Sequence, residues 1–108
     1  MKTNNPYIAG IPDCYYSGPG SDLWVEYKFI LKLPTRVPIV VNLSALQLHW
    51  LDSRHAEGRN VAVIVGTPTG GVVFRMGGPW EITTADFQSQ IISRKELANW
   101  IATQTIGK

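Results

Sequence analysis

A strand of alternating apolar and polar side chains, preceded by a dense turn sequence, restricts the fold of this chain most. The alternation runs over Asp22–Leu31 and puts Glu26 and Lys28 on one face of the strand. The turn sequence Ser-Gly-Pro-Gly-Ser comes directly before it and predicts a β-hairpin whose first arm is Ile11–Tyr16. Asp13 lies early in this first arm, so the hairpin is expected to bring two acids and a lysine together.

Two segments carry the signals that begin a helix. Ser44 is followed by Gln47, and Ser93 by a glutamate three residues later, and both pairs match the capping box. The first pair predicts a helix from Ser44 to about Glu57, ended by Gly58, and the second predicts a docking helix that starts at Ser93. Gln47 lies on the face of the first helix that should pack against the sheet. A capping role and a role in a site are both open for it, and they are compatible.

The remaining pattern predicts further strands and a small central sheet. Asn60–Val65 is a continuous apolar run, typical of a strand buried on both faces, and Val72–Arg75 pairs back on it after a glycine-rich turn. Ile39–Val41 is a short strand or a packed approach to the first helix, and Thr84 could cap a short helix over Ala85–Gln90. The order hairpin, helix, hairpin, helix predicts a mixed α/β fold, a small mixed β-sheet with flanking helices. We expect residues 1–108 to form a single domain.

Composition excludes some classes of protein and does not by itself indicate a function. A hydrophobic content of 44% with 17% charged residues is typical of a globular chain and not of a disordered one. No apolar run approaches the roughly 20 residues that span a bilayer, and the first residues lack the apolar core of a signal peptide. Because Cys14 is the single cysteine, an internal disulfide is excluded and a reducing compartment fits. We therefore expect a cytoplasmic location, in a cell or in a phage-infected host, and no membrane partner.

Four pieces of the chain, in order and spacing, resemble the PD-(D/E)XK nuclease superfamily. They are Gly10-Ile11-Pro12-Asp13, then Val25-Glu26-Tyr27-Lys28, then Leu43-Ser44-x-x-Gln47, and then Gly58 before an apolar strand. Within the superfamily the chain is most similar to the VRR-NUC group, small nucleases found in phages and in some DNA-repair enzymes, related in fold to Holliday-junction resolvases. The resemblance covers roughly residues 8–66 and implies a restriction-endonuclease-like core.

The resemblance also implies a role for each matching residue. Asp13 and Glu26 match the two metal-binding carboxylates, and the backbone carbonyl of Tyr27 would complete the metal ligands of the protein. Lys28 matches the lysine that positions or activates the attacking water, and Gln47 matches a polar helix residue that borders the site. Asp13, Glu26, Lys28 and Gln47 are thus the expected catalytic residues. The implied cofactor is Mg²⁺ or Mn²⁺, and the implied reaction is hydrolysis of a phosphodiester bond in DNA.

Physical chemistry supports the same roles. A hard divalent cation prefers oxygen ligands, and it helps hydrolysis by activating water and by neutralising developing negative charge. Lys28 lies one pleat beyond Glu26 on the same face, where its ammonium group could stabilise the transition state. Taken alone, however, two such residues in a strand also fit an exposed ion pair with little effect on stability.

The chain departs from the superfamily at one point. Many members carry a further acid on a helix before the Pro-Asp strand, whereas none of the twelve residues before Asp13 is acidic. The protein either works with the smaller ligand set or receives the missing group from elsewhere, such as a second subunit. A homodimer is also expected by analogy, because cutting two strands requires two sites.

The expected partner is DNA, bound through its backbone or its structure and not through its base sequence. The net charge of +2 tolerates a nucleic-acid partner without requiring one. Lys32, Arg36 and Arg54 are the preferred phosphate contacts among the basic residues. The alternative is a catalytically inactive module with a nuclease fold that binds nucleic acid or a protein partner. A third option is a small phage accessory protein whose resemblance to nucleases is accidental.

Overall fold

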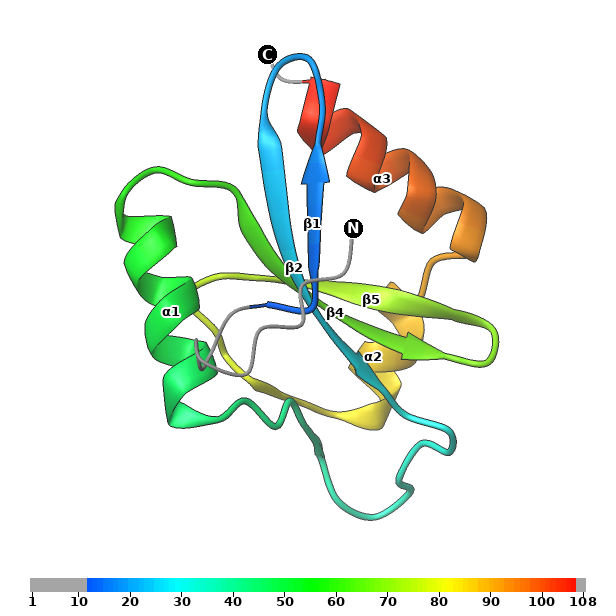
Figure 1. Ribbon diagram of the computed structural model, residues 1–108. Helices are drawn as coiled ribbons and strands as arrows, with labels where there is room; N and C mark the ends of the chain where they lie inside the picture. Colours follow the sequence, from blue (N-terminus) through cyan, green and yellow to red (C-terminus); the bar gives the residue numbers. More distant parts are fainter. Residues whose placement is uncertain (1–11, 107–108) are drawn as a thin grey trace.

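A four-stranded mixed sheet forms the centre of the protein (Figure 1). The computed structural model describes residues 12–106. The strands lie in the order β1-β2-β4-β5, where β2 and β4 are parallel and the two outer pairs are antiparallel. Their bounds are Cys14–Ser17 for β1, Asp22–Phe29 for β2, Val61–Thr67 for β4 and Gly70–Arg75 for β5. The predicted mixed α/β fold with a small mixed sheet is confirmed.

The first hairpin forms as predicted, with shorter arms. β1 and β2 pair antiparallel from Cys14 opposite Val25 to Ser17 opposite Asp22. The first arm begins at Cys14 because Pro12, two residues earlier, has no N–H to give to the ladder. Ile11, where we expected this arm to begin, lies outside the described residues. The second arm ends at Phe29, before the expected Leu31.

The period-two pattern divides the side chains of the sheet between two apolar layers. On one face, Leu23, Val25 and Ile64 pack against Trp100 and its neighbours on α3 (Arg94–Ile106). On the other face, alternate residues of β4 pack with Leu51 of α1 (Ala45–Ala56) and with α2 (Thr84–Gln90). Figure 1 shows α1 and α3 on different sides of the sheet. The central strands β2 and β4 are therefore covered on both faces. This packing restricts the movement of the polar residues on β2.

Both capping boxes form where the sequence predicts them. The Ser44 side chain accepts a hydrogen bond from the Gln47 N–H, and the Gln47 side chain accepts one from the Ser44 N–H. Ser93 and Glu96 make the same pair of bonds at the start of α3, at 2.9 and 3.1 Å. Gly58, with a positive φ of 82°, follows α1 as expected for a residue in the left-handed region.

The cap of the short helix α2 differs from the prediction by one residue. The Thr83 side chain accepts the hydrogen bond from the Asp86 N–H, so Thr83 is the N-cap and Thr84 is the first helical residue. The Thr84 hydroxyl instead donates to the Pro34 carbonyl at 2.6 Å. This tertiary contact ties α2 to the connection after β2, and the local sequence gives no signal for it.

A second, two-stranded sheet joins the connection after β2 to the segment before α2. It consists of β3 (Ile39–Val40) and β6 (Glu81–Ile82), which pair antiparallel. The strand reading of Ile39–Val41 is thus confirmed for its first two residues. Within residues 12–106, no helix combines the length and the apolar character needed to cross a membrane.

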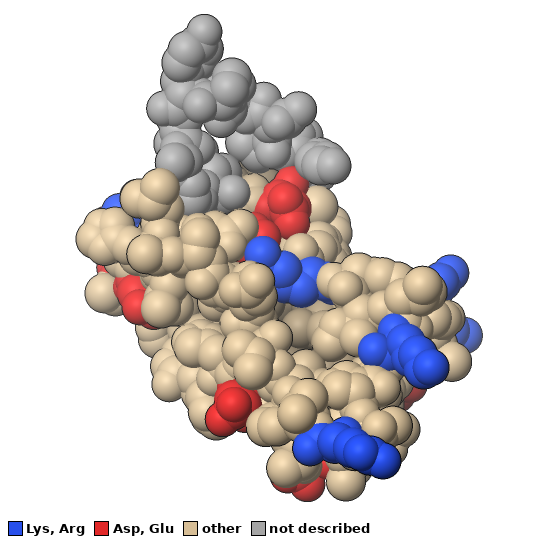
Figure 2. Space-filling view, turned by 90° about the horizontal axis from the view of Figure 1, so that it is seen from below, with Lys and Arg blue, Asp and Glu red and all other residues tan. Residues whose placement is uncertain are grey.

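The surface seen from below carries both signs of charge (Figure 2). Near the middle of this face, an acidic patch adjoins a basic one, and further Lys and Arg side chains lie toward its margins. The connection between β2 and β3 contributes two exposed basic residues, Lys32 and Arg36. It also exposes apolar side chains, of which Leu31 is the most accessible at 78%.

Candidate metal centre

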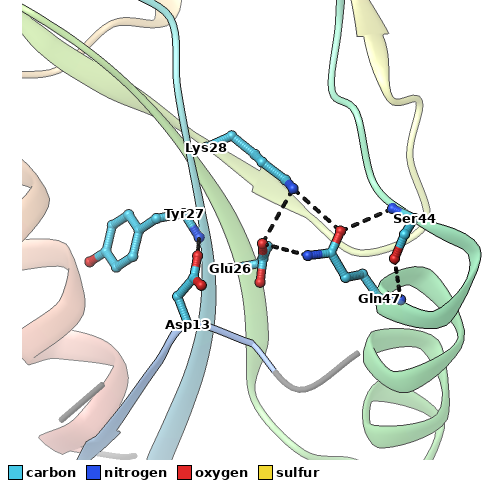
Figure 3. Close-up of polar contacts among 6 residues, drawn as sticks. All are labelled: Asp13, Glu26, Tyr27, Lys28, Ser44 and Gln47. Atoms are coloured by element: carbon cyan, nitrogen blue, oxygen red, sulfur yellow. Dashed lines mark hydrogen bonds and ion pairs between the residues drawn. The ribbon is translucent and has the colours of Figure 1, made fainter. Parts of the chain in front are cut away.

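Asp13 lies beside β2, just before its own strand begins. Its Oδ2 accepts a hydrogen bond from the backbone N–H of Tyr27 at 3.2 Å (Figure 3). The register that pairs Cys14 with Val25 would pair Pro12 with Tyr27 if β1 continued. The Asp13 carboxylate therefore accepts the hydrogen bond that a longer β1 would have accepted, and this bond holds Asp13 beside β2 at Tyr27.

The same register leaves the Tyr27 carbonyl available as a ligand. In a strand, the N–H and the C=O of one residue point toward the same neighbour, so this carbonyl also faces the side on which Asp13 lies. The residue opposite it would be Pro12, which is buried and has no N–H to donate. The phenol of Tyr27 points to the other face, where its oxygen lies 2.7 Å from that of Tyr16. Burial raises the pKa of this phenol, so it stays neutral.

Glu26 is a buried carboxylate with one oxygen left over. Only 4% of its side chain is exposed. Its Oε2 accepts a hydrogen bond from Gln47 Nε2 at 2.9 Å and lies 3.4 Å from Lys28 Nζ. Its Oε1 is buried and has no hydrogen-bond partner among residues 12–106. A buried polar atom without a partner lowers the stability of the fold by about 1–3 kcal/mol, and by more when it is charged. A cation bound to Oε1 would offset this loss.

The electrostatics of Glu26 agree with a cation site. Burial raises the pKa of Glu26, the negative charge of Asp13 raises it further, and Lys28 acts in the opposite direction. The Asp13 charge acts on Glu26 because Asp13 binds the backbone of Tyr27, the next residue of β2. The oxygen atoms of Asp13 and Glu26, with the Tyr27 carbonyl, are of the kind that a hard divalent cation prefers, and these residues would hold it.

The raised pKa of Glu26 predicts a pH-dependent loss of stability without metal. The folded protein retains this proton above the ordinary value of 4.5, at which the unfolded chain releases it. The free energy of unfolding in EDTA should therefore fall as the pH rises from 4.5 through the folded pKa of Glu26, and the loss should level off above that pKa. Urea unfolding of wild type and Glu26→Gln between about pH 4 and 8 measures this. The advantage of the variant should grow with pH, whereas a constant difference would contradict a pKa of Glu26 that burial raises in the folded protein.

Gln47 serves both the helix cap and the site. Its Oε1 accepts hydrogen bonds from the Ser44 N–H at 2.9 Å and from Lys28 Nζ at 3.3 Å, while its Nε2 donates to Glu26 (Figure 3). The capping role is confirmed, and the same amide contacts two of the expected site residues because the first turn of α1 abuts β2. The capping box fixes the amide so that it holds the acid and the lysine in a defined relation.

Three variants separate the two roles of Gln47. Gln47→Ala should lower the free energy of unfolding in EDTA by about 1–2 kcal/mol, because it removes the cap and the donor to Glu26. Glu96→Ala in α3 removes an equivalent capping partner remote from Glu26, and its loss should be smaller. Gln47→Glu retains the cap but faces Glu26 with another carboxylate, so it should be less stable than wild type in EDTA and recover with Mg²⁺. A Gln47→Glu protein as stable as wild type in EDTA would show that Gln47 is only a cap.

The three expected phosphate contacts lie away from these carboxylates. Lys32 and Arg36 are exposed in the connection after β2, and neither forms an ion pair within the described part of the chain. Arg54 lies seven residues after Gln47 on α1, about 10 Å along the helix axis. Its guanidinium pairs with Glu57 at 2.7 Å and lies over the Trp50 ring at 5.4 Å. The phosphate role of all three stays a prediction.

The described chain offers no third acid at the site. Between residues 12 and 106, no group of three or more His, Cys, Asp or Glu side chains could hold a metal ion. Two carboxylates and one carbonyl therefore remain the expected ligands from this part of the chain. Sequence reasoning had missed one contributor, Pro12, whose lack of an N–H leaves the Tyr27 carbonyl free of a ladder donor. Register counting from the hairpin turn is the signal that could have found it.

Comparison with models of protein families, with curated proteins and with solved structures gives no significant match. The chemistry of the site must be argued from its own residues.

Proposed function

We propose that this protein is a metal-dependent endonuclease that hydrolyses phosphodiester bonds in DNA. The observation that carries the proposal is the buried Glu26 carboxylate, whose Oε1 has no partner among the described residues while Asp13 and Lys28 lie beside it. We propose further that the chain is related to the PD-(D/E)XK superfamily. Its core would then be restriction-endonuclease-like, similar to those of VRR-NUC nucleases and Holliday-junction resolvases. The proposal also includes the cytoplasmic location expected from the sequence.

Asp13, Glu26 and the Tyr27 carbonyl would hold Mg²⁺ or Mn²⁺. When bound, such an ion lowers the pKa of water and neutralises charge on a phosphate oxygen. Ser44 and Gln47 keep the first turn of α1 against this group through the capping box. These contacts fix the ligands before substrate binds, so little reorganisation is needed during the reaction.

Lys28 is suited to act between the buried acid and the solvent. Its side chain is 28% exposed, and its ammonium group touches both Glu26 and Gln47. From this position the ammonium can hydrogen-bond an attacking water or a non-bridging phosphate oxygen and stabilise the negative charge that develops there. Gln47 holds the lysine through its Oε1 and the acid through its Nε2, so the spacing between acid and ammonium is set by one residue.

Backbone or structure recognition fits the proposal better than base reading. The described residues form one small fold with no element set apart for a DNA groove, and phosphate contacts position a protein without specifying sequence. Lys32 and Arg36 would extend the basic surface from the site, and Arg54 would have to exchange Glu57 for a phosphate. A homodimer would supply the two sites needed to cut both strands.

The direct test is cleavage of supercoiled plasmid in Mg²⁺, Mn²⁺ or EDTA, followed by single-stranded, duplex, flap and four-way DNA. Nicking that requires the metal is expected, and the panel identifies the preferred structure. The alternative, an inactive nuclease-fold module, is favoured by the lack of a third acid in residues 12–106. Binding of DNA without cleavage in any metal would support that module and overturn the enzyme.

A further inference from the structure

A basic cavity lies at the opposite end of α1 from the candidate metal centre. Gln47 is in the first turn of this helix, whereas His55 is in its last turn and lines the cavity. The cavity has a volume of about 440 Å³ and lies among the end of α1, the start of β4, the end of β5 and the last turns of α3. We call it the arginine cavity, after Arg59 and Arg75, which line it together with His55.

The lining of the arginine cavity favours an anion. Two arginines and a histidine contribute to it, and no Asp or Glu of the described residues does. Neutral donors, among them Asn60 and Ser21, complete the wall. Guanidinium groups bind phosphate oxygens in pairs through parallel N–H groups. This composition suits an anion, such as a phosphate group, better than an apolar ligand.

One wall of the cavity is held in place by contacts of its own. The Arg75 guanidinium lies over the Trp100 ring at 5.5 Å and donates to Gln104 Oε1 at 3.4 Å. Asn60 Nδ2 also donates to Gln104, at 3.3 Å to its carbonyl oxygen and 3.4 Å to Oε1. Arg75 is therefore oriented before a ligand arrives, which reduces the conformational entropy lost on binding.

The acidic residues near the arginine cavity neutralise only part of the charge of Arg59, so most of it can attract an anion. Glu57 contacts Arg59 only through Nε, at 3.5 Å, and it is shared with Arg54. The Arg59 side chain is still 59% exposed. Asp22 lines a smaller adjoining cavity, where it accepts a hydrogen bond from the Tyr15 hydroxyl. A phosphate could therefore bind Arg59 without displacing a buried partner.

A smaller cavity that adjoins the arginine cavity lies on the face of β2 that carries Glu26. The adjoining cavity shares Arg59 and Asn60 with the arginine cavity and reaches Trp24. Trp24 lies two residues before Glu26 on the same face of the strand, which is about 7 Å. Along α1, the eight residues from Gln47 to His55 span about 12 Å. Phosphates of one DNA strand are about 3.4 Å apart along the axis, so this span corresponds to three or four phosphates.

We infer that the arginine cavity binds a backbone phosphate of the nucleic-acid strand. This phosphate lies three or four phosphates away from the phosphodiester bond that is cleaved at the candidate metal centre. The choice of nucleic acid as the ligand rests on the proposed function, whereas the anion preference rests on the cavity itself. The cavity would hold the strand in register, so that a fixed phosphate lies at the metal centre.

Salt dependence of binding tests the inference. Binding of a fluorescein-labelled 12-base-pair DNA duplex is measured by anisotropy in EDTA, over a range of salt concentrations. Each phosphate contact contributes about 0.9 to the slope of log K against log salt for duplex DNA, so Arg59→Gln/Arg75→Gln, which loses the one phosphate of the cavity, should make the slope shallower by about 0.9. The matched control Arg94→Gln/Lys95→Gln removes two exposed charges at the start of α3 and should leave the slope unchanged.

Two further measurements keep the test decisive. Arg59→Gln alone, at a largely exposed side chain, should make the slope shallower by no more than about 0.9, and it keeps Arg75 in its packing on Trp100. Titration with inorganic phosphate, followed by the NMR signals of the arginine Nε–H groups, should shift Arg59 and Arg75, and the oligonucleotide should compete. Equal slopes in all variants, or phosphate binding that the oligonucleotide does not displace, would overturn the assignment.

The result is separable from the test of the nuclease. Binding in EDTA needs no bound metal and no hydrolysis. Metal-dependent cleavage with an unchanged salt slope in Arg59→Gln/Arg75→Gln would reject the arginine cavity and leave the nuclease standing. A reduced slope without cleavage in any metal would reject the nuclease and retain the cavity as a nucleic-acid site.

Discussion

Replacing Glu26 with glutamine is expected to lower the rate of metal-dependent plasmid nicking at least about 10³-fold, because the loss of a buried metal ligand removes several kcal/mol of transition-state stabilisation. Glutamine has nearly the same shape, so the packing around β2 should be preserved. The variant should also lose Mn²⁺ binding measured by calorimetry. In EDTA it should unfold at a higher temperature than wild type, since a buried charge beside Asp13 is gone.

A matched control for this change is Glu81→Gln in the exposed strand β6. It removes the same charge at the surface, and its cleavage rate and Mn²⁺ affinity should equal those of wild type. Nicking by Glu26→Gln at the wild-type rate would contradict the metal centre. An unchanged Mn²⁺ affinity in Glu26→Gln would also contradict the metal centre, because Oε1 would then have some other role.

Lys28→Met is expected to lower the cleavage rate about 10²- to 10³-fold while leaving metal binding intact. Methionine keeps much of the aliphatic stem and removes the ammonium group, which contacts Glu26 and Gln47 and is expected to stabilise the charge that develops on the phosphate. Mn²⁺ should bind as tightly as in wild type or more tightly, since a neighbouring positive charge is gone. Single-turnover cleavage at saturating metal, together with calorimetry, separates the two effects.

The control for Lys28 is Lys95→Met, which makes the same change on the exposed side of α3 and should leave the cleavage rate at the wild-type level. Parallel loss of metal affinity and rate in Lys28→Met would mean that the lysine only holds Glu26 in place. A full cleavage rate would remove Lys28 from the mechanism.

Much of the local structure could be predicted because its signals act over a few residues. The Gly-Pro-Gly bend turns the chain between β1 and β2, and the capping boxes at Ser44 and Ser93 start two helices as expected. The boundary of a helix was harder to predict where a contact with a distant residue determines it. Thr84 is drawn from the cap position by the Pro34 carbonyl, fifty residues away, and no local pattern carries that information.

The candidate site shows the same division. A period of two places Glu26 and Lys28 on one face of any strand, so their proximity follows from the sequence. The burial of Glu26 does not follow from it, because burial requires β4 alongside β2 and the first turn of α1 over the acid. The sequence also marked Arg59 and Arg75 as basic residues without placing them together, since they lie on separate elements that meet only in the folded protein.

By itself, then, the sequence determined the hairpin, the helix starts and the residues that alternate toward each face, because backbone geometry and short-range hydrogen bonds set these. Only the tertiary structure decided which of the polar residues lose water. Packing of α1 against the sheet removed solvent from Glu26, whose Oε1 has no partner among residues 12–106, and the end of β1 at Cys14 left the Tyr27 N–H to the Asp13 carboxylate. Desolvation depends on contacts between distant segments, and it turns an ordinary strand acid into a candidate metal ligand.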